Sequence, residues 1–154
     1  MPSLDYEKIY SKFRLKASAY DLIAMNDDDV SVFLCEWLHS SINKPYIRRL
    51  FANITLDDLL QEMNFEMKYS TDDDFDKEFI MDVIGIGMVI EWITPKINSL
   101  NNIVQVFGSK EEKFYSQSNH LNELRNLKNS LINEQQSIIK ERGYIWNSYL
   151  GDNS

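Results

Sequence analysis

The sequence predicts a mainly α fold, a helical bundle with a long C-terminal helix and at most one short β-hairpin. Three observations support this prediction: apolar residues recur at helical spacing, one segment is apolar nearly all round, and the last third repeats apolar residues every seven positions. With 154 residues, 44% of them hydrophobic, the chain has the size of a single domain spanning residues 1–154. Its 5 Gly and 3 Pro are scattered, so no flexible linker is expected.

Two helices are predicted in the front part of the chain. The first follows Ser3, a candidate N-cap. The second follows the acidic residues 27–29, which favour the partial positive charge of a helix N-terminus, and Pro45 ends or bends it. The apolar stripes are Leu4, Tyr6, Ile9, Tyr10 and Phe13 in the first helix, and Val30, Phe33, Leu34, Trp37, Leu38, Ser41 and Ile42 in the second.

A strand is predicted after a single helical turn at residues 56–60. Apolar and polar residues alternate from Met63 to Tyr69, which is the period of a half-buried strand. Because an isolated strand cannot satisfy its own backbone groups, we expect it to pair with residues 50–54 or with a neighbouring subunit.

The segment of residues 79–93 is apolar nearly all round, which predicts a helix enclosed by other helices at the centre of the fold. Gly85 and Gly87 each cost about 1 kcal/mol in a helix relative to Ala, so they are expected to permit the close approach of another helix. Pro95 either kinks this helix or starts the next one, whose apolar residues continue to Gly108.

The last helix repeats apolar residues at a spacing of seven. One row comprises Leu124, Leu131, Ile138 and Ile145, and an adjacent row comprises Ile132, Ile139 and Trp146. Roughly 30 helical residues would reach about 45 Å, which is more than a bundle of this size needs. Part of the helix is therefore expected to project towards a partner.

Charge and cysteine usage narrow the classes of function. The 24 acidic residues outnumber the 16 basic ones, giving a net charge of -8, which disfavours binding to a phosphate backbone. A single cysteine and an N-terminus unlike a signal peptide favour a reducing cytoplasm. The longest apolar run is shorter than the roughly 20 residues that span a bilayer, so no membrane association is expected.

No catalytic constellation emerges from the sequence, and we expect no enzyme, no cofactor and no metal site. His39 and His120 have no context that places them beside a nucleophile, and Cys35 lies on an apolar helix as a small core residue. The acidic run at residues 72–76 matches the first ligand positions of a calcium loop, but Lys77 and Val83 replace its required Gly and Glu. Solvated carboxylates capping the next helix are the preferred interpretation.

The C-terminus is the strongest candidate binding feature. Its candidate partner-binding residues are Tyr144, Trp146, Tyr149 and Leu150, because aromatic anchors dominate the binding energy of interfaces. The alternative is that Trp146 and Tyr149 pack back on the first helix. Little chain remains beyond Tyr149 and Leu150 to cover them, which favours a partner.

Two segments resemble the small helical neck proteins of tailed bacteriophages, the head-tail connector adaptors. The first is Gly85-Ile86-Gly87-Met88-Val89-Ile90-Glu91-Trp92-Ile93-Thr94-Pro95, an apolar helix with a Trp-x-x-Pro exit. The second is a polar crossing with Phe114-Tyr115-Ser116 followed by a long Asn- and Leu-rich helix. The resemblance covers roughly residues 80–150, and the front half matches only as a pattern of helices.

The resemblance implies a structural virion protein of the neck, assembled in the host cytoplasm. Such a subunit would form a ring, typically 12-fold, beneath the portal and extend the DNA channel to the tail. Its partners would be the portal protein, neighbouring copies of itself and a stopper or tail protein, while DNA passes without specific binding. Acidic charge fits such a channel. The alternative function is a small acidic helical phage regulator or inhibitor that binds a host protein.

Overall fold

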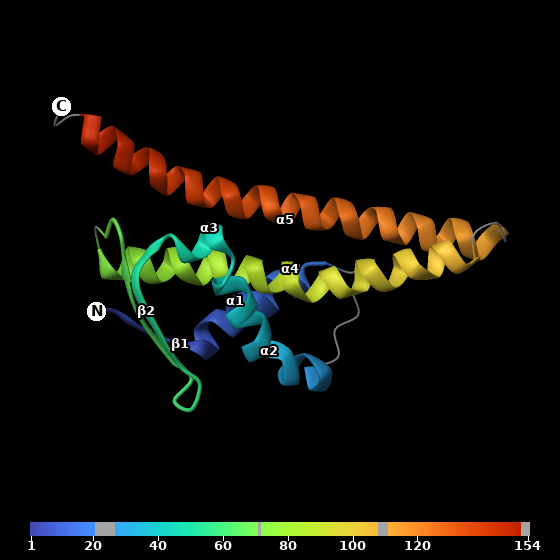
Figure 1. The fold of residues 1–154 in the computed structure, drawn as a ribbon, viewed down its shortest axis with the longest axis horizontal. Coiled ribbons are helices and arrows are strands. Elements are labelled where there is room, and N and C mark those ends of the chain that lie inside the picture. Colours follow the sequence, from blue (N-terminus) through green and yellow to red (C-terminus); the bar gives the residue numbers. More distant parts are fainter. Residues whose placement is uncertain (21–26, 71, 108–110, 152–154) are drawn as a thin grey trace.

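The computed structural model describes residues 1–20, 27–70, 72–107 and 111–151, and within them the side chains of residues 1–20, 30–70, 72–102 and 118–143. Two long antiparallel helices, α4 (Asp73–Phe107) and α5 (Glu111–Gly151), run along the molecule. Most of the shorter elements pack beside α4 on the side away from α5, while residues 45–48 lie between the two long helices in this view (Figure 1). The hydroxyl of Tyr46 donates to Gln135 Oε1 of α5 at 3.2 Å. The predicted mainly α fold with a long C-terminal helix is confirmed.

The short helices are α1 (Tyr6–Ser18), α2 (Asp27–Ile42) and α3 (Pro45–Arg48). The first two agree with the apolar stripes, although α1 begins three residues after the predicted cap Ser3. Residues 3–5 form a strand instead, because the extended chain there pairs with a neighbouring strand. Pro45 occupies the first turn of α3, where its missing N–H costs no helical hydrogen bond.

Three antiparallel strands form a small sheet in the order β1-β3-β2. They are β1 (Ser3–Asp5), β2 (Phe51–Asp57) and β3 (Glu62–Met67), with Leu4 opposite Met63 and Ile54 opposite Phe65. The predicted strand and its pairing with the preceding segment are confirmed. One face of the sheet is buried against the helices and carries Leu4, Phe51, Met63, Phe65 and Met67.

The helical turn predicted at residues 56–60 is wrong. Residues 56 and 57 end β2, and the backbone then reverses in a turn in which Asp57 Oδ1 accepts hydrogen bonds from the N–H groups of Leu59 (3.1 Å) and Leu60 (3.0 Å). A carboxylate that hydrogen-bonds to the backbone two and three residues on stabilises a turn in the same way that it caps a helix. The sequence signal for the two structures is therefore the same.

Helix α4 is the centre of the fold, as the apolar segment predicted. The approach predicted at its glycines is also confirmed: a Cβ on Gly85 would lie 3.0 Å from Lys12 Cβ in α1, and one on Gly87 would lie 2.0 Å from Ser41 Oγ in α2. The buried residues of α4 are Phe79, Ile80, Met81, Val83, Ile84, Ile86, Met88, Val89, Ile90, Trp92, Ile93 and Ile97, with Asp76.

Helix α4 continues through Pro95 to Phe107. The predicted exit at the Trp-x-x-Pro sequence is therefore wrong, and Phe114-Tyr115-Ser116 belongs to α5 instead of a polar crossing. The proline lacks the N–H that would bond the carbonyl of Glu91, and packing of the apolar face on both sides of it offsets this loss. The side chain of Thr94 donates to the carbonyl of Ile90 at 2.7 Å.

Helix α5 buries a stripe against α4 that is only partly the predicted one. Leu124 and Leu131 are buried, while Ile132, Ile138 and Ile139 are half-buried. Two polar residues seven positions apart, Gln135 and Arg142, also face the core, together with Leu121 and Leu127. The side chains of Ile145 and Trp146 lie outside the described residues. No helix in the described part of the chain is both long and apolar enough to cross a membrane.

Candidate functional site

Near the end of the part of α5 whose side chains are described lies a buried ion pair. Arg142 Nη2 donates to Asp76 Oδ1 at 2.8 Å and to the carbonyl of Tyr69 at 2.7 Å. The two side chains are 8% and 1% exposed, respectively. Ser70 Oγ donates to the second carboxylate oxygen of Asp76 at 2.5 Å, and the guanidinium lies 4.8 Å from the centre of the Phe79 ring. This cluster fastens α5 to the first turn of α4.

The ion pair also corrects the interpretation of the acidic run at residues 72–76 as solvated carboxylates. Asp76 is buried and has a cation as partner, so one of the three carboxylates of the calcium template is already engaged. Asp72, Asp73 and Asp74 are exposed at the start of α4, where their charge favours the helix N-terminus. The structure thus assigns this run to capping and anchoring.

Beyond Arg142 the backbone of α5 remains helical to Gly151, and this end diverges from α4 (Figure 1). The four residues predicted to bind a partner, Tyr144, Trp146, Tyr149 and Leu150, belong to this end. Their side chains lie outside the described residues, so the prediction that they contact a partner stays a prediction.

A second cluster lies where the turn between β2 and β3 meets α1 and α2. Ligand atoms of Cys35, His39 and Asp58 all lie within 4.8 Å of one another. His39 Nε2 is 2.8 Å from Asp58 Oδ1, and the hydroxyl of Tyr6 donates to the same oxygen at 2.7 Å. Cys35 and His39 lie four residues apart on α2, which places them on one face of the helix.

Hydrogen bonding and burial set the proton affinities in this cluster. The hydrogen bonds from Tyr6 and His39 hold the pKa of the Asp58 carboxyl below its usual value. Burial and then the charge of Asp58 raise the pKa of the Cys35 thiol, while burial and then the hydrogen bond to Asp58 raise that of Tyr6. A thiol with a raised pKa is a poor nucleophile, which argues against cysteine catalysis here.

Tyr10 completes the inner wall of this cluster. Its side chain is 4% exposed, and its hydroxyl lies beside the thiol of Cys35, a weak acceptor. Burial, followed by the neighbouring Cys35, raises the pKa of this hydroxyl. The buried hydroxyl is thus only weakly hydrogen-bonded in an otherwise apolar core.

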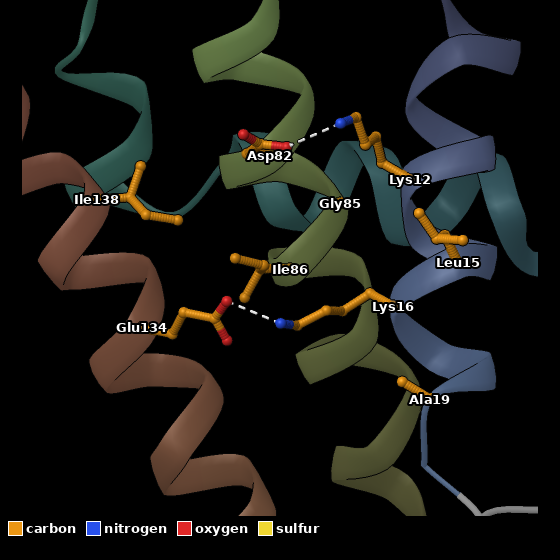
Figure 2. Close-up of a pocket in the computed structure, with 9 residues that line it drawn as sticks. All are labelled: Lys12, Leu15, Lys16, Ala19, Asp82, Gly85, Ile86, Glu134 and Ile138. Atoms are coloured by element: carbon orange, nitrogen blue, oxygen red, sulfur yellow. Dashed lines mark hydrogen bonds and ion pairs between the residues drawn. The ribbon is translucent and has the colours of Figure 1, made fainter.

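A groove of about 300 Å³ lies between α1, α4 and α5 (Figure 2). Its charged side chains are paired across it, with Lys12 Nζ 3.3 Å from Asp82 and Lys16 Nζ 2.7 Å from Glu134. The remaining lining is Leu15, Ala19, Gly85, Ile86 and Ile138. Because each cation already faces a carboxylate, the groove has no surplus charge that would select a charged ligand.

Sequence reasoning missed the cluster of Cys35, His39 and Asp58. Cys35 was expected in the core and packs against it, but it is only half-buried. The spacing of four between Cys35 and His39 was a signal, although the third member comes from a turn that sequence reasoning described as helical. His120, the other histidine, is half-exposed on α5.

The chain was compared with protein-family models, with curated proteins and with solved structures, and nothing matches it in any of the three.

Proposed function

We propose that this protein is a structural connector of the tailed-phage neck, a head-tail adaptor that docks on the portal through the C-terminal end of α5. In this proposal it has no catalytic task. Copies of the chain form a ring, of 12 subunits by the resemblance, that extends the DNA channel towards a stopper or tail protein. In this proposal the protein is assembled in the host cytoplasm and is located in the neck of the virion.

One observation carries the proposal: α5 continues as a helix after its buried anchor at Arg142. Arg142 is fixed to the first turn of α4, and the backbone of the following residues to Gly151 diverges from α4 (Figure 1). A helix can be inserted into a groove of a partner, which is a common mode of protein recognition. The aromatic residues of this end are of the kind that anchors interfaces.

The sequence resemblance supports this proposal, and two details of the structure differ from what it implied. The Gly-containing apolar helix and the Leu-rich last helix, which carry the resemblance, pack together in the fold. The two details that differ are the uninterrupted passage through Pro95 and the helical state of Phe114-Tyr115-Ser116.

Contacts between ring neighbours would use the shorter elements. Several apolar side chains on these elements are exposed to solvent: Leu15, Val32, Phe33, Leu59 and Leu60. Leu59 is 97% exposed at the tip of the β2–β3 turn, where it contributes nothing to the core. A neighbouring copy that covered these residues would gain the hydrophobic free energy that the monomer leaves unused.

The test is cross-linking of lysines in purified virions, followed by mass spectrometry. Lys140 is exposed near the end of α5, and Lys128 is half-exposed about three turns earlier in the same helix. Because docking is through the end of α5, portal docking predicts links from Lys140 and fewer links from Lys128. Absence of the chain from intact virions would refute the connector and favour the phage regulator that binds a host protein.

A truncation supplies the matched control. Removal of residues 144–154 keeps the anchor at Arg142 and is expected to leave thermal unfolding nearly unchanged while abolishing portal binding. Removal of residues 152–154 alone should preserve both. If the longer truncation still docks on the portal, the end of α5 is not the interface.

A further inference from the structure

The cluster of Cys35, His39 and Asp58 brings together a thiol, an imidazole and a carboxylate from two separate parts of the fold. Cys35 and His39 are supplied by α2, and Asp58 is supplied by the β2–β3 turn. From this geometry we propose that the three side chains bind a transition-metal ion, and that Zn²⁺ is the ion they fit best. The site was not expected from the sequence, and it is independent of the connector proposal.

The donor set selects the class of metal. Zinc accepts thiolate, imidazole and carboxylate ligands together, whereas calcium and magnesium require oxygen ligands. In a tetrahedral zinc site with bonds of about 2.0–2.3 Å, ligand atoms lie roughly 3.3–3.8 Å apart. The ligand atoms here lie within 4.8 Å of one another, so movements of about 1 Å complete the site.

These movements are small for the side chains concerned. Cys35 and His39 are half-exposed and Asp58 is exposed, so each can rotate without disturbing the core. On binding, the thiol proton leaves to solvent and the direct contact of 2.8 Å between His39 and Asp58 opens. Three protein ligands leave the fourth position to a water molecule.

Two tyrosines behind the ligands would act as outer-sphere donors. The Tyr6 hydroxyl already holds Asp58 at 2.7 Å and fixes the orientation of the carboxylate. The Tyr10 hydroxyl is buried and lies beside the thiol of Cys35, a weak acceptor. A metal-bound thiolate would be a stronger acceptor for this hydroxyl, in the manner of an outer-sphere partner.

The experiment is a titration of the full chain, freed of metal by chelation and kept reduced with a phosphine, with Co²⁺ and then Zn²⁺. Cobalt bound by Cys35 is expected to give a thiolate-to-metal charge-transfer band, saturating at one ion per chain. Zinc should displace the cobalt and raise the melting temperature in proportion to the logarithm of its concentration.

Four variants locate the site. Cys35→Ser is expected to abolish the charge-transfer band, and His39→Gln and Asp58→Asn to weaken binding. Tyr10 is not one of the ligands, and Tyr10→Phe is expected to weaken metal binding by roughly 10–100-fold, as the removal of outer-sphere partners does. His120→Gln is the matched control and should bind like the parent protein.

Circular dichroism of each variant without metal checks that it is folded. The proposal is overturned if the parent protein shows no charge-transfer band, or if a folded Cys35→Ser variant binds zinc as tightly as the parent. Loss of binding in His120→Gln alone would place the metal elsewhere and would also overturn it.

Discussion

Breaking the buried ion pair between Arg142 and Asp76 tests how the C-terminal helix is held. Asp76→Asn removes the charge and keeps the shape, while Arg142→Met keeps an aliphatic chain near Phe79 and removes the cation. Loss of one partner from a buried pair costs about 3–5 kcal/mol when the other charge stays buried. With side-chain exposures of 1% and 8%, this pair meets that condition in the folded protein.

The loss has a ceiling, because the last turns of α5 can lift from α4 and return the unpaired charge to water. Between Gln135 and Arg142 only the half-buried Ile138 and Ile139 add apolar contact. At about 1 kcal/mol for each half-buried isoleucine, detachment costs about 2 kcal/mol. Detachment also gives up the net contribution of the ion pair, so we expect each single variant to lower the free energy of unfolding by about 2–3 kcal/mol.

Two measurements separate these effects. Urea unfolding at neutral pH gives the free energy, and the expected loss corresponds to roughly 4–12 °C in melting temperature. Hydrogen exchange should show faster exchange of the amides of residues 136–143 in the variants, while α4 stays protected. The double variant should lose less than the sum of the single ones. Surface substitutions usually change the free energy of unfolding by less than about 0.5 kcal/mol. Single variants that stay within this margin of the parent, with unchanged hydrogen exchange, would refute this account of the anchor.

Three further predictions concern the core. Gly87→Ala should lower the free energy of unfolding by about 1–2 kcal/mol because the added Cβ collides with Ser41 of α2. Gly143→Ala should raise it by about 0.5–1 kcal/mol because its Cβ meets no other atom and alanine favours the helix. Equal urea midpoints of the two variants would contradict this. Tyr6→Phe loses a hydrogen bond to a carboxylate and should cost about 1.5–3 kcal/mol in the metal-free protein. Tyr10→Phe loses only a contact with the weak acceptor Cys35 and should cost less than Tyr6→Phe; calorimetry giving the reverse order would be decisive against this. Burial raises the pKa of Tyr46, so the contribution of its neutral side chain to stability is complete below pH 10.0 and is lost as the pH rises through the pKa of the folded state. Tyr46→Phe should flatten this loss when the free energy of unfolding is measured by urea titration at increasing pH, and an unchanged dependence on pH would count against the prediction.

The longer helices α1, α2, α4 and α5 could be predicted because each has an apolar face with a period of 3.6 residues, whereas the four residues of α3 are too few to show one. The apolar segment of α4 and the spacing of seven in α5 indicated a central helix and a long partner, and both are present. The strand β1 could not be predicted, since three residues are too few to show a period. Its extended state comes from pairing with β3, which is distant in the sequence.

The candidate sites show the same limit. Gln135 and Arg142 occupy core positions of the repeat, but their polarity hides them from a search for apolar residues. Each is buried because a specific partner satisfies it: the carbonyl of Val83 accepts from Gln135 Nε2 at 2.8 Å, and Asp76 accepts from Arg142. The metal-ligating cluster depends on a turn that places Asp58 beside α2, a contact between distant parts of the chain.

The pairing of the first strand with the third has a consequence during synthesis. Ser3 and Glu62 are hydrogen-bonded across 59 positions, and α1 buries its apolar face against α4, which is made later still. At about 5–20 residues per second, the ribosome leaves Tyr6, Ile9 and Phe13 uncovered for several seconds. These residues are thus made well before the elements that cover them, although they end among the most deeply buried residues of the protein.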